Sequence, residues 1–206
     1  MNITKLKHAE ALFLQSYPTG FLHPRLEDVG KKHKMPQMIE LTQQSFAKKK
    51  FRHTHEIADS MVKITSSSSM VSAFEKPKFK AFVANLTTNE LVKLVDGFQA
   101  YLHGNQQKGF EAMLASLSAF KLAKWPLMTI LPNYYSPDEN VFVKPTTAKG
   151  VIKYFELQNI EYKPLPSWDF YQRYREAILE MKSHVVDTLA PNNAAFCGFL
   201  MMSLNN

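Results

Sequence analysis

Apolar residues recur at helical spacing along most of the chain, most clearly between residues 87 and 118. One stripe there has apolar side chains at i, i+4, i+7 and i+11: Leu91, Val95, Phe98 and Leu102. A capping box, Thr87-x-x-Glu90, precedes this stripe, and Gly-Asn at 104–105 separates it from a second apolar pattern. A link this short predicts an antiparallel helical hairpin.

The same periodicity, read with caps and helix breakers, predicts further helices. They cover residues 3–16, 36–47, about 55–64, a segment restarted at Pro77, 147–157, 168–187 and the end of the chain after Asn192 or Asn193. The last helix, AAFCGFLMMSL, is apolar nearly all round, so we expect it to be the most buried element. The chain is predicted to be mainly α, a single compact multi-helical domain over residues 1–206.

Two segments break the helical pattern. Residues 125–146, WPLMTILPNYYSPDENVFVKPT, contain four prolines. A proline inside a helix removes a hydrogen bond and clashes with the preceding turn. We therefore predict an irregular proline-rich segment, with at most a short strand at 141–143. The serine tract at 65–70 is predicted to be a loop or a sub-domain boundary.

Charge is distributed unevenly along the chain. The formal net charge is +7, and residues 1–53 hold ten Lys or Arg against four Asp or Glu. This asymmetry favours an acidic partner, with nucleic acid first, although a solvated basic face that aids solubility is the alternative. The candidate nucleic-acid or anion contacts are Lys31, Lys32, Lys34, Lys48, Lys49, Lys50, Arg52, Lys144 and Lys149. Phe51 and the nearby histidines are candidates for stacking on bases.

The stretch VFVKPTTAKGV, residues 141–151, combines lysines, hydroxyls and a glycine as phosphate-binding loops do. A Walker loop needs Gly-x-x-x-x-Gly-Lys-Ser/Thr, and neither Lys144 nor Lys149 follows a glycine. We therefore predict that Pro145 ends an extended segment and that Thr146 caps a helix. An anion held at this helix N-terminus by the two lysines is the alternative.

Other candidate chemistry is sparse. RHTHE at 52–56 is the best metal candidate, but histidines at i and i+2 point to different sides of a helix, and surface histidines are the simpler interpretation. Cys197, the single cysteine, lies within the most apolar predicted helix, where we expect an inert core residue. The sequence therefore indicates no cofactor, no metal and no catalytic residue, and favours a binding protein over an enzyme.

The expected compartment follows from the same features. A single cysteine and the lack of a signal-peptide pattern favour the cytoplasm. No uncharged apolar run reaches the roughly 18 residues that a membrane-spanning helix needs, so no membrane partner is expected.

Several phrases share a further pattern: YPTGF, WPLMTILP, VFVKPTTAKGV, YKPLPSWDFYQRY and LAPNNAAFCGFLMMSL. Their W-P…F-x-K-P-T block, followed by Y-x-P…Y and a terminal P-x-(N/D)…G-F helix, resembles that of an uncharacterised family of bacterial proteins. The resemblance implies no catalytic residue. It implies that residues 141–151 and the C-terminal helix belong to one structural module.

Three functions stay open on the sequence alone. The leading hypothesis is a non-enzymatic binding protein whose basic first quarter contacts nucleic acid or another acidic partner. The second is a helical interaction module that self-associates, for example as a homodimer. The third is a protein or enzyme that binds a small anion or nucleotide in a pocket near residues 144–149 and 125–135.

Overall fold

The chain is mainly helical in the part that the computed structural model describes, which is residues 1–204 apart from the side chain of Glu27. The α-helices are α1 (Ile3–Ser16), α2 (Pro24–His33), α3 (Met35–Ser45), α4 (Thr54–Ser67), α5 (Glu75–Ala84), α6 (Thr88–His103), α7 (Gln106–Ser118), α8 (Trp125–Tyr135), α9 (Pro145–Tyr154), α10 (Trp168–Ser183) and α11 (Asn193–Ser203). Short 3-10 helices are η1 (Gly20–Leu22), η2 (Lys48–Arg52) and η3 (Asp187–Leu189). No strand occurs within these described residues, so the prediction of a mainly α fold is confirmed.

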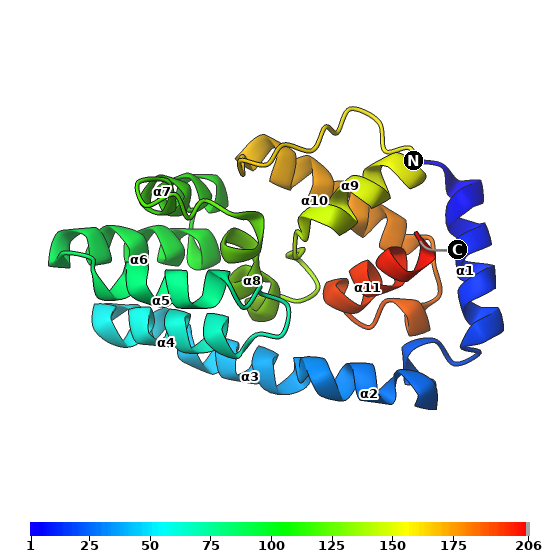
Figure 1. The fold of residues 1–206 in the computed structure, drawn as a ribbon, viewed down its shortest axis with the longest axis horizontal. Coiled ribbons are helices and arrows are strands. Elements are labelled where there is room, and N and C mark those ends of the chain that lie inside the picture. Colours follow the sequence, from blue (N-terminus) through cyan, green and yellow to red (C-terminus); the bar gives the residue numbers. More distant parts are fainter. Residues whose placement is uncertain (205–206) are drawn as a thin grey trace.

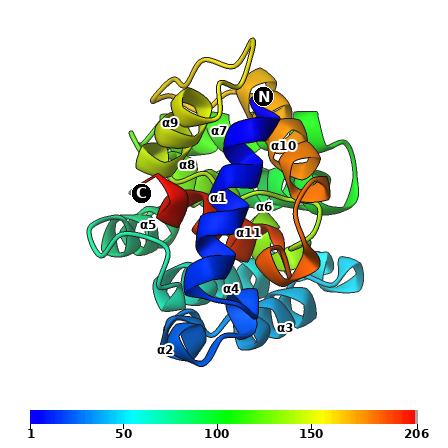
Figure 2. The same ribbon diagram turned by 90° about the vertical axis from the view of Figure 1, so that its right-hand side faces the viewer.

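The helices form two groups on either side of α8 (Figure 1). One group contains α4, α5, α6 and α7, and the other contains α1, α9, α10 and α11. Helices α2 and α3 follow one edge of the molecule from the second group to the first, and α1 lies across α11 (Figure 2). Buried apolar side chains from both groups and from α8 form one core cluster, which makes a single compact arrangement.

The predicted helical hairpin is present as α6 and α7. The Glu90 carboxylate accepts a hydrogen bond from the Thr87 amide at 2.8 Å, and the Thr87 hydroxyl accepts one from the Glu90 amide at 3.4 Å. Asn105 then caps α7 by accepting from the Lys108 amide. Gly109 lets the two helices approach closely, because a Cβ there would overlap the backbone of Tyr101.

The prediction of irregular structure at 125–146 is wrong for residues 125–135, which form α8. Pro126 lies in the first turn, where its missing N–H has no intrahelical acceptor. Pro132 lies inside the helix and costs about 3 kcal/mol. Every residue of α8 from Trp125 to Tyr134 is buried, and a fully buried large apolar side chain contributes about 1.5–3 kcal/mol. Tertiary burial therefore outweighs the local cost of the proline.

Residues 136–144 are irregular, and side chains of neighbouring helices hold them in place. The Tyr171 hydroxyl donates to Asn140 Oδ1 at 3.1 Å and accepts from the Val141 amide at 3.3 Å. The Val143 amide donates to the Thr129 hydroxyl at 3.0 Å. Side chains thus bind amides that a neighbouring strand would otherwise bind, and this extended segment forms no strand in the described structure.

Helix α2 was not predicted from the sequence. Pro24 occupies its first turn and His23 caps it by accepting from the Arg25 amide at 3.2 Å. Leu26 is its one core residue and Val29 its other large apolar side chain, so its apolar face is short. Lys34, in the left-handed conformation with φ +48°, joins α2 to α3.

Candidate ligand-binding cavity

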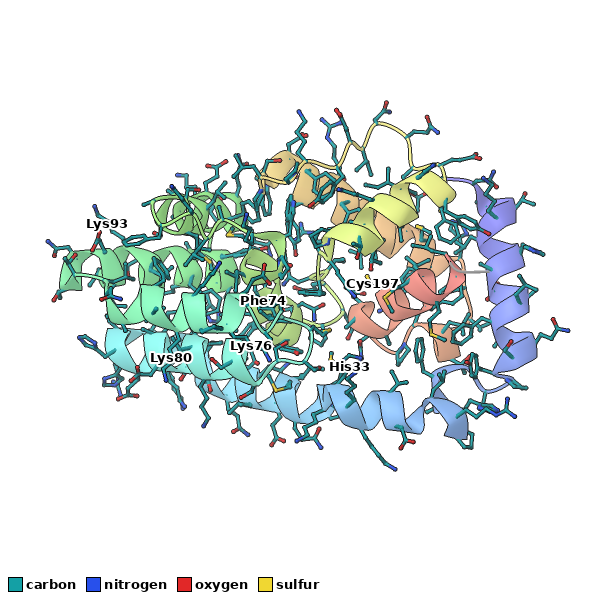
Figure 3. The ribbon with its side chains drawn as sticks, viewed as in Figure 1. His33, Phe74, Lys76, Lys80, Lys93 and Cys197 are labelled. Carbon is teal, nitrogen blue, oxygen red and sulfur yellow. The ribbon has the colours of Figure 1, made fainter. Side chains whose placement is uncertain are left out.

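A cavity of about 350 Å³ lies between α2, the start of α9 and α11. Its walls are mostly apolar, and six of the lining side chains are Phe21, Leu26, Val29, Phe142, Met201 and Met202. Figure 3 shows His33 at the end of α2, below α11, which carries Cys197; both residues line the cavity. The walls come from segments more than 100 residues apart in sequence, so only the folded chain forms this site.

Helix α11 supplies one wall of the cavity, which corrects the expectation that it would be the most buried element. Phe196, Phe199 and Leu200 are buried in the core, but Met201 on the cavity side is 38% exposed. Gly198 leaves space there, because a Cβ added to it would meet only Phe21, at 3.7 Å. One side of α11 is therefore buried and the side with Cys197, Gly198 and Met201 faces the cavity, whereas α8 is buried almost throughout.

Helix α9 begins at the edge of the cavity, and its first turn has no side-chain cap. The predicted cap at Thr146 is wrong: α9 starts at Pro145, with Lys144 as the N-cap residue. A lysine side chain has no acceptor atom, so it cannot bind the first amides of the helix. The local reason is Pro145, whose fixed φ suits the first helical position and brings the start forward.

Two polar side chains project from this helix start. Lys144 lines the cavity, and its ammonium group lies 3.9 Å from Met201 Sδ, a weak acceptor. Thr147 also lines the cavity and is only 6% exposed. Within the described residues its hydroxyl makes no hydrogen bond. A threonine inside a helix can donate to the backbone carbonyl four residues earlier, but for Thr147 that residue, Val143, lies before the start of α9. By contrast, the buried hydroxyl of Thr129 donates to the Trp125 carbonyl at 2.8 Å.

The first turn of α11 borders the same cavity. Asn192 caps this helix by accepting from the Ala195 amide at 2.9 Å, as predicted, and both residues line the cavity together with Ala194. Two helix N-termini therefore meet the cavity, and each carries a partial positive charge. Among the lining residues whose side chains are described, none is acidic.

His33 closes the α2 side of the cavity. Its Nδ1 shares a 2.8 Å hydrogen bond with the Ser69 hydroxyl, which links α2 to the loop after α4. Burial lowers the pKa of His33, and the neighbouring charges of Lys32 and Lys144 lower it further. His33 is therefore mainly neutral at pH 7.

Cys197 lines the cavity rather than filling the core. Burial raises the pKa of its thiol to about 12. The thiolate is the nucleophilic form of cysteine, so this side chain is unreactive at neutral pH.

The first basic group predicted from the sequence lies next to the cavity. Lys31 and Lys34 line a second hollow beside α2, of about 750 Å³, whose walls share Phe21 and Gly30 with the cavity. Lys32 is exposed on the same helix end. The structure therefore places Lys31, Lys32 and Lys34 beside the cavity that Lys144 lines.

The second basic group lies elsewhere. Residues 48–52 form η2, beyond the far end of α3, whose 11 residues span about 16 Å. Lys48, Lys49 and Lys50 are exposed there. Phe51 is buried against Phe46 and Phe98, so the expectation that it stacks on a base is wrong. Arg52 donates from Nε to His53 at 3.0 Å.

Lys149 diverges from Lys144 although both belong to the start of α9. Its ammonium group lies 5.0 Å from the centre of the Tyr162 ring, and Lys149 does not line the cavity. The two lysines that the sequence analysis grouped together are thus on different sides of the helix.

The described part of the chain has neither a metal-ligand cluster nor a membrane-spanning helix. Within it, no group of three or more His, Cys, Asp and Glu side chains is placed to hold a metal ion. None of the described helices combines the length and apolar character that crossing a bilayer requires.

The chain matches no known protein family, no curated protein and no solved structure. The resemblance to a bacterial family stays a prediction.

The sequence analysis named Lys144 but missed the other residues that shape the cavity, notably His33, Thr147 and Gly198. The available signal was an end helix that is apolar all round yet carries a glycine near its middle. Such a helix presents more apolar surface than one core contact can cover.

Proposed function

We propose that the protein binds a small molecule with an apolar body in the cavity between α2, α9 and α11. The cavity itself is the observation that carries this proposal. Its volume of about 350 Å³ lies in the range of small-molecule sites, roughly 300–1,000 Å³, and its walls are mainly apolar with a few polar groups. An apolar cavity of about 150 Å³ is already large enough to bind benzene.

This proposal is closest to the third hypothesis from the sequence, a pocket near residues 144–149. Lys144 belongs to the cavity, whereas Lys149 and the α8 segment at 125–135 do not line it. The role proposed is binding, because the mainly apolar walls of the cavity carry this proposal.

Filling the cavity tests the proposal. In Gly198→Leu the new side chain enters the space beside Phe21, so we expect 1-octanol to bind the wild-type protein and to bind this variant at least tenfold more weakly. Isothermal titration calorimetry measures both affinities. The control is Ala115→Leu, which adds the same side chain to an exposed position of α7 and leaves binding unchanged. Absence of binding to the wild-type protein would remove the proposal.

Nucleic-acid binding is the second candidate, and the exposure of Lys48, Lys49 and Lys50 on η2 favours it. Phosphate contacts release counterions, so we expect binding that weakens with salt. Replacing these three lysines by alanine should lower the slope of log K against log salt by about 3.

A matched control for this test lies on α5, where the triple variant of Lys76, Lys78 and Lys80 also removes three positive charges (Figure 3 labels Lys76 and Lys80). An electrophoretic mobility shift assay at low salt gives the readout. Equal losses in both triple variants would mean that only net charge matters, and no shift at all would dismiss this candidate.

A further inference from the structure

We infer that the cavity has an anion-binding end, formed by Lys144, Thr147 and the first turn of α9, and that its ligand is an amphipathic monocarboxylate. This inference rests on the proposed function, because it names the ligand class of the same cavity. It predicts that a carboxylate group lies at the α9 end while an apolar chain fills the space towards Phe21 and Gly198.

Lys144 is exposed at the edge of the cavity. Within the described residues, its ammonium group contacts the Met201 thioether at 3.9 Å, and no carboxylate accepts from it. A lysine at the mouth of an apolar cavity can extend its apolar stem along the wall and direct its charge to a ligand.

The Thr147 hydroxyl is the second polar group at this end of the cavity. Although the residue is largely buried, its hydroxyl oxygen is accessible from the cavity and can therefore reach a ligand there. Thr147 is 6% exposed, lines the cavity, and has no partner for its hydroxyl among the described residues. A ligand oxygen beside it would accept the missing hydrogen bond.

The start of α9 has no side-chain cap. Pro145 has no N–H, so Thr146 and Thr147 carry the first free amides, and no side chain accepts from them. Free amides at a helix N-terminus attract anions. At α11 the Asn192 side chain already binds the Ala195 amide, so α9 is the better of the two helix starts for a ligand.

The charge and size of the site define the ligand further. Lys144 is the one charged side chain among the described residues that line the cavity, whereas Lys31, Lys32 and Lys34 lie outside it at the neighbouring end of α2. We therefore expect the α9 end to balance a single negative charge. At roughly 30 Å³ per non-hydrogen atom, the volume of a water in the liquid, the cavity holds about ten to twelve such atoms. Octanoate and decanoate have this size.

The test compares ligands that share one chain and differ in the head group. Isothermal titration calorimetry with octanoate, 1-octanol, octylammonium and octyl phosphate should give the tightest binding for octanoate. In Lys144→Met, which keeps an apolar stem, octanoate affinity should fall about tenfold while octanol affinity is unchanged. In Thr147→Val, which keeps the shape, the loss for octanoate should be about fivefold.

Lys149→Met is the matched control, because it removes the same charge from the same helix at a position outside the cavity. It should bind octanoate as the wild type does. Thermal melting checks that each variant is folded.

If octanol binds as tightly as octanoate, or Lys144→Met keeps the preference for octanoate, the cavity still binds ligands but the anion-binding end is refuted. Tighter binding of octyl phosphate would overturn the monocarboxylate assignment. If no compound binds, the proposed function fails as well.

Discussion

Cys197 and His33 face the same cavity, and the protein environment moves the pKa of each away from the physiological range. The thiol of Cys197 is kept protonated and the imidazole of His33 is kept neutral. At the scale of single residues, the cavity wall is therefore uncharged except at Lys144.

The reactivity of Cys197 tests this. With a pKa of about 12, roughly one thiol in ten thousand is ionised at pH 8, so reaction with Ellman's reagent should be at least a hundredfold slower in the native protein than in urea. Cys197 is the single cysteine, so the assay has no background. Rapid labelling of the native protein would contradict the burial of this thiol.

His33 predicts a dependence of stability on pH. Its pKa is lowered in the folded state, so between that value and the unfolded value near 6.5 the unfolded chain binds more protons. Stability should therefore fall as the pH drops through this window. Urea unfolding of the wild type and of His33→Gln, from pH 8 to pH 5, should show a smaller fall in the variant.

The control for this series is His55→Gln, an exposed position on α4 away from the cavity. Its pH profile should follow that of the wild type. A profile of His33→Gln that also follows the wild type would mean that His33 does not contribute to the fall.

At the scale of elements, local signals succeed where a helix carries its own cap and stripe. The capping box of α6 and the Asn105 cap of α7 are formed as predicted. The same rules failed for α8 because the burial that stabilises it comes from other elements. They failed for α2 because its apolar face has only two large side chains, Leu26 and Val29.

A pair of glycine variants tests the packing of the α6–α7 hairpin. Gly109→Ala should lower the free energy of unfolding by about 1–3 kcal/mol, because its Cβ would overlap the backbone of Tyr101. Gly30→Ala in α2 has no atom within 4 Å of its Cβ and should raise stability by about 0.5–1 kcal/mol through helix propensity. Urea denaturation measures both. A neutral effect of Gly109→Ala would show that the helices can separate at little cost.

At the scale of the whole molecule, α8 connects the two groups of helices. Its Trp125 ring packs on Phe170 of α10, with 4.9 Å between ring centres, and the indole N–H donates to the Lys163 carbonyl at 2.8 Å. Its Tyr134 hydroxyl shares a 2.9 Å hydrogen bond with Ser68, just after α4. We therefore expect the two groups to unfold together.

A cavity in α8 tests this expectation. Ile130→Ala removes a fully buried side chain and should cost about 2–5 kcal/mol. Tryptophan fluorescence reports on Trp125 and Trp168, and circular dichroism reports on all helices. Within each protein, wild type or variant, the two probes should give the same unfolding midpoint, and the midpoint of the variant should be lower. Separate midpoints would show two units. Val92→Ala, at an exposed position of α6, should change stability by less than about 0.5 kcal/mol.

The sequence by itself determined the mainly α class, the α6–α7 hairpin and the capped starts of α10 and α11, because caps and apolar stripes act within one or two turns of the chain. It also identified Lys144 as a candidate anion contact. Only the tertiary structure decided that α8 is a helix and that α11 leaves one face open. It also decided that Lys144 and Thr147 line the cavity while Lys149 lies against Tyr162, outside it. These outcomes depend on burial and on contacts between distant segments, which no local pattern contains.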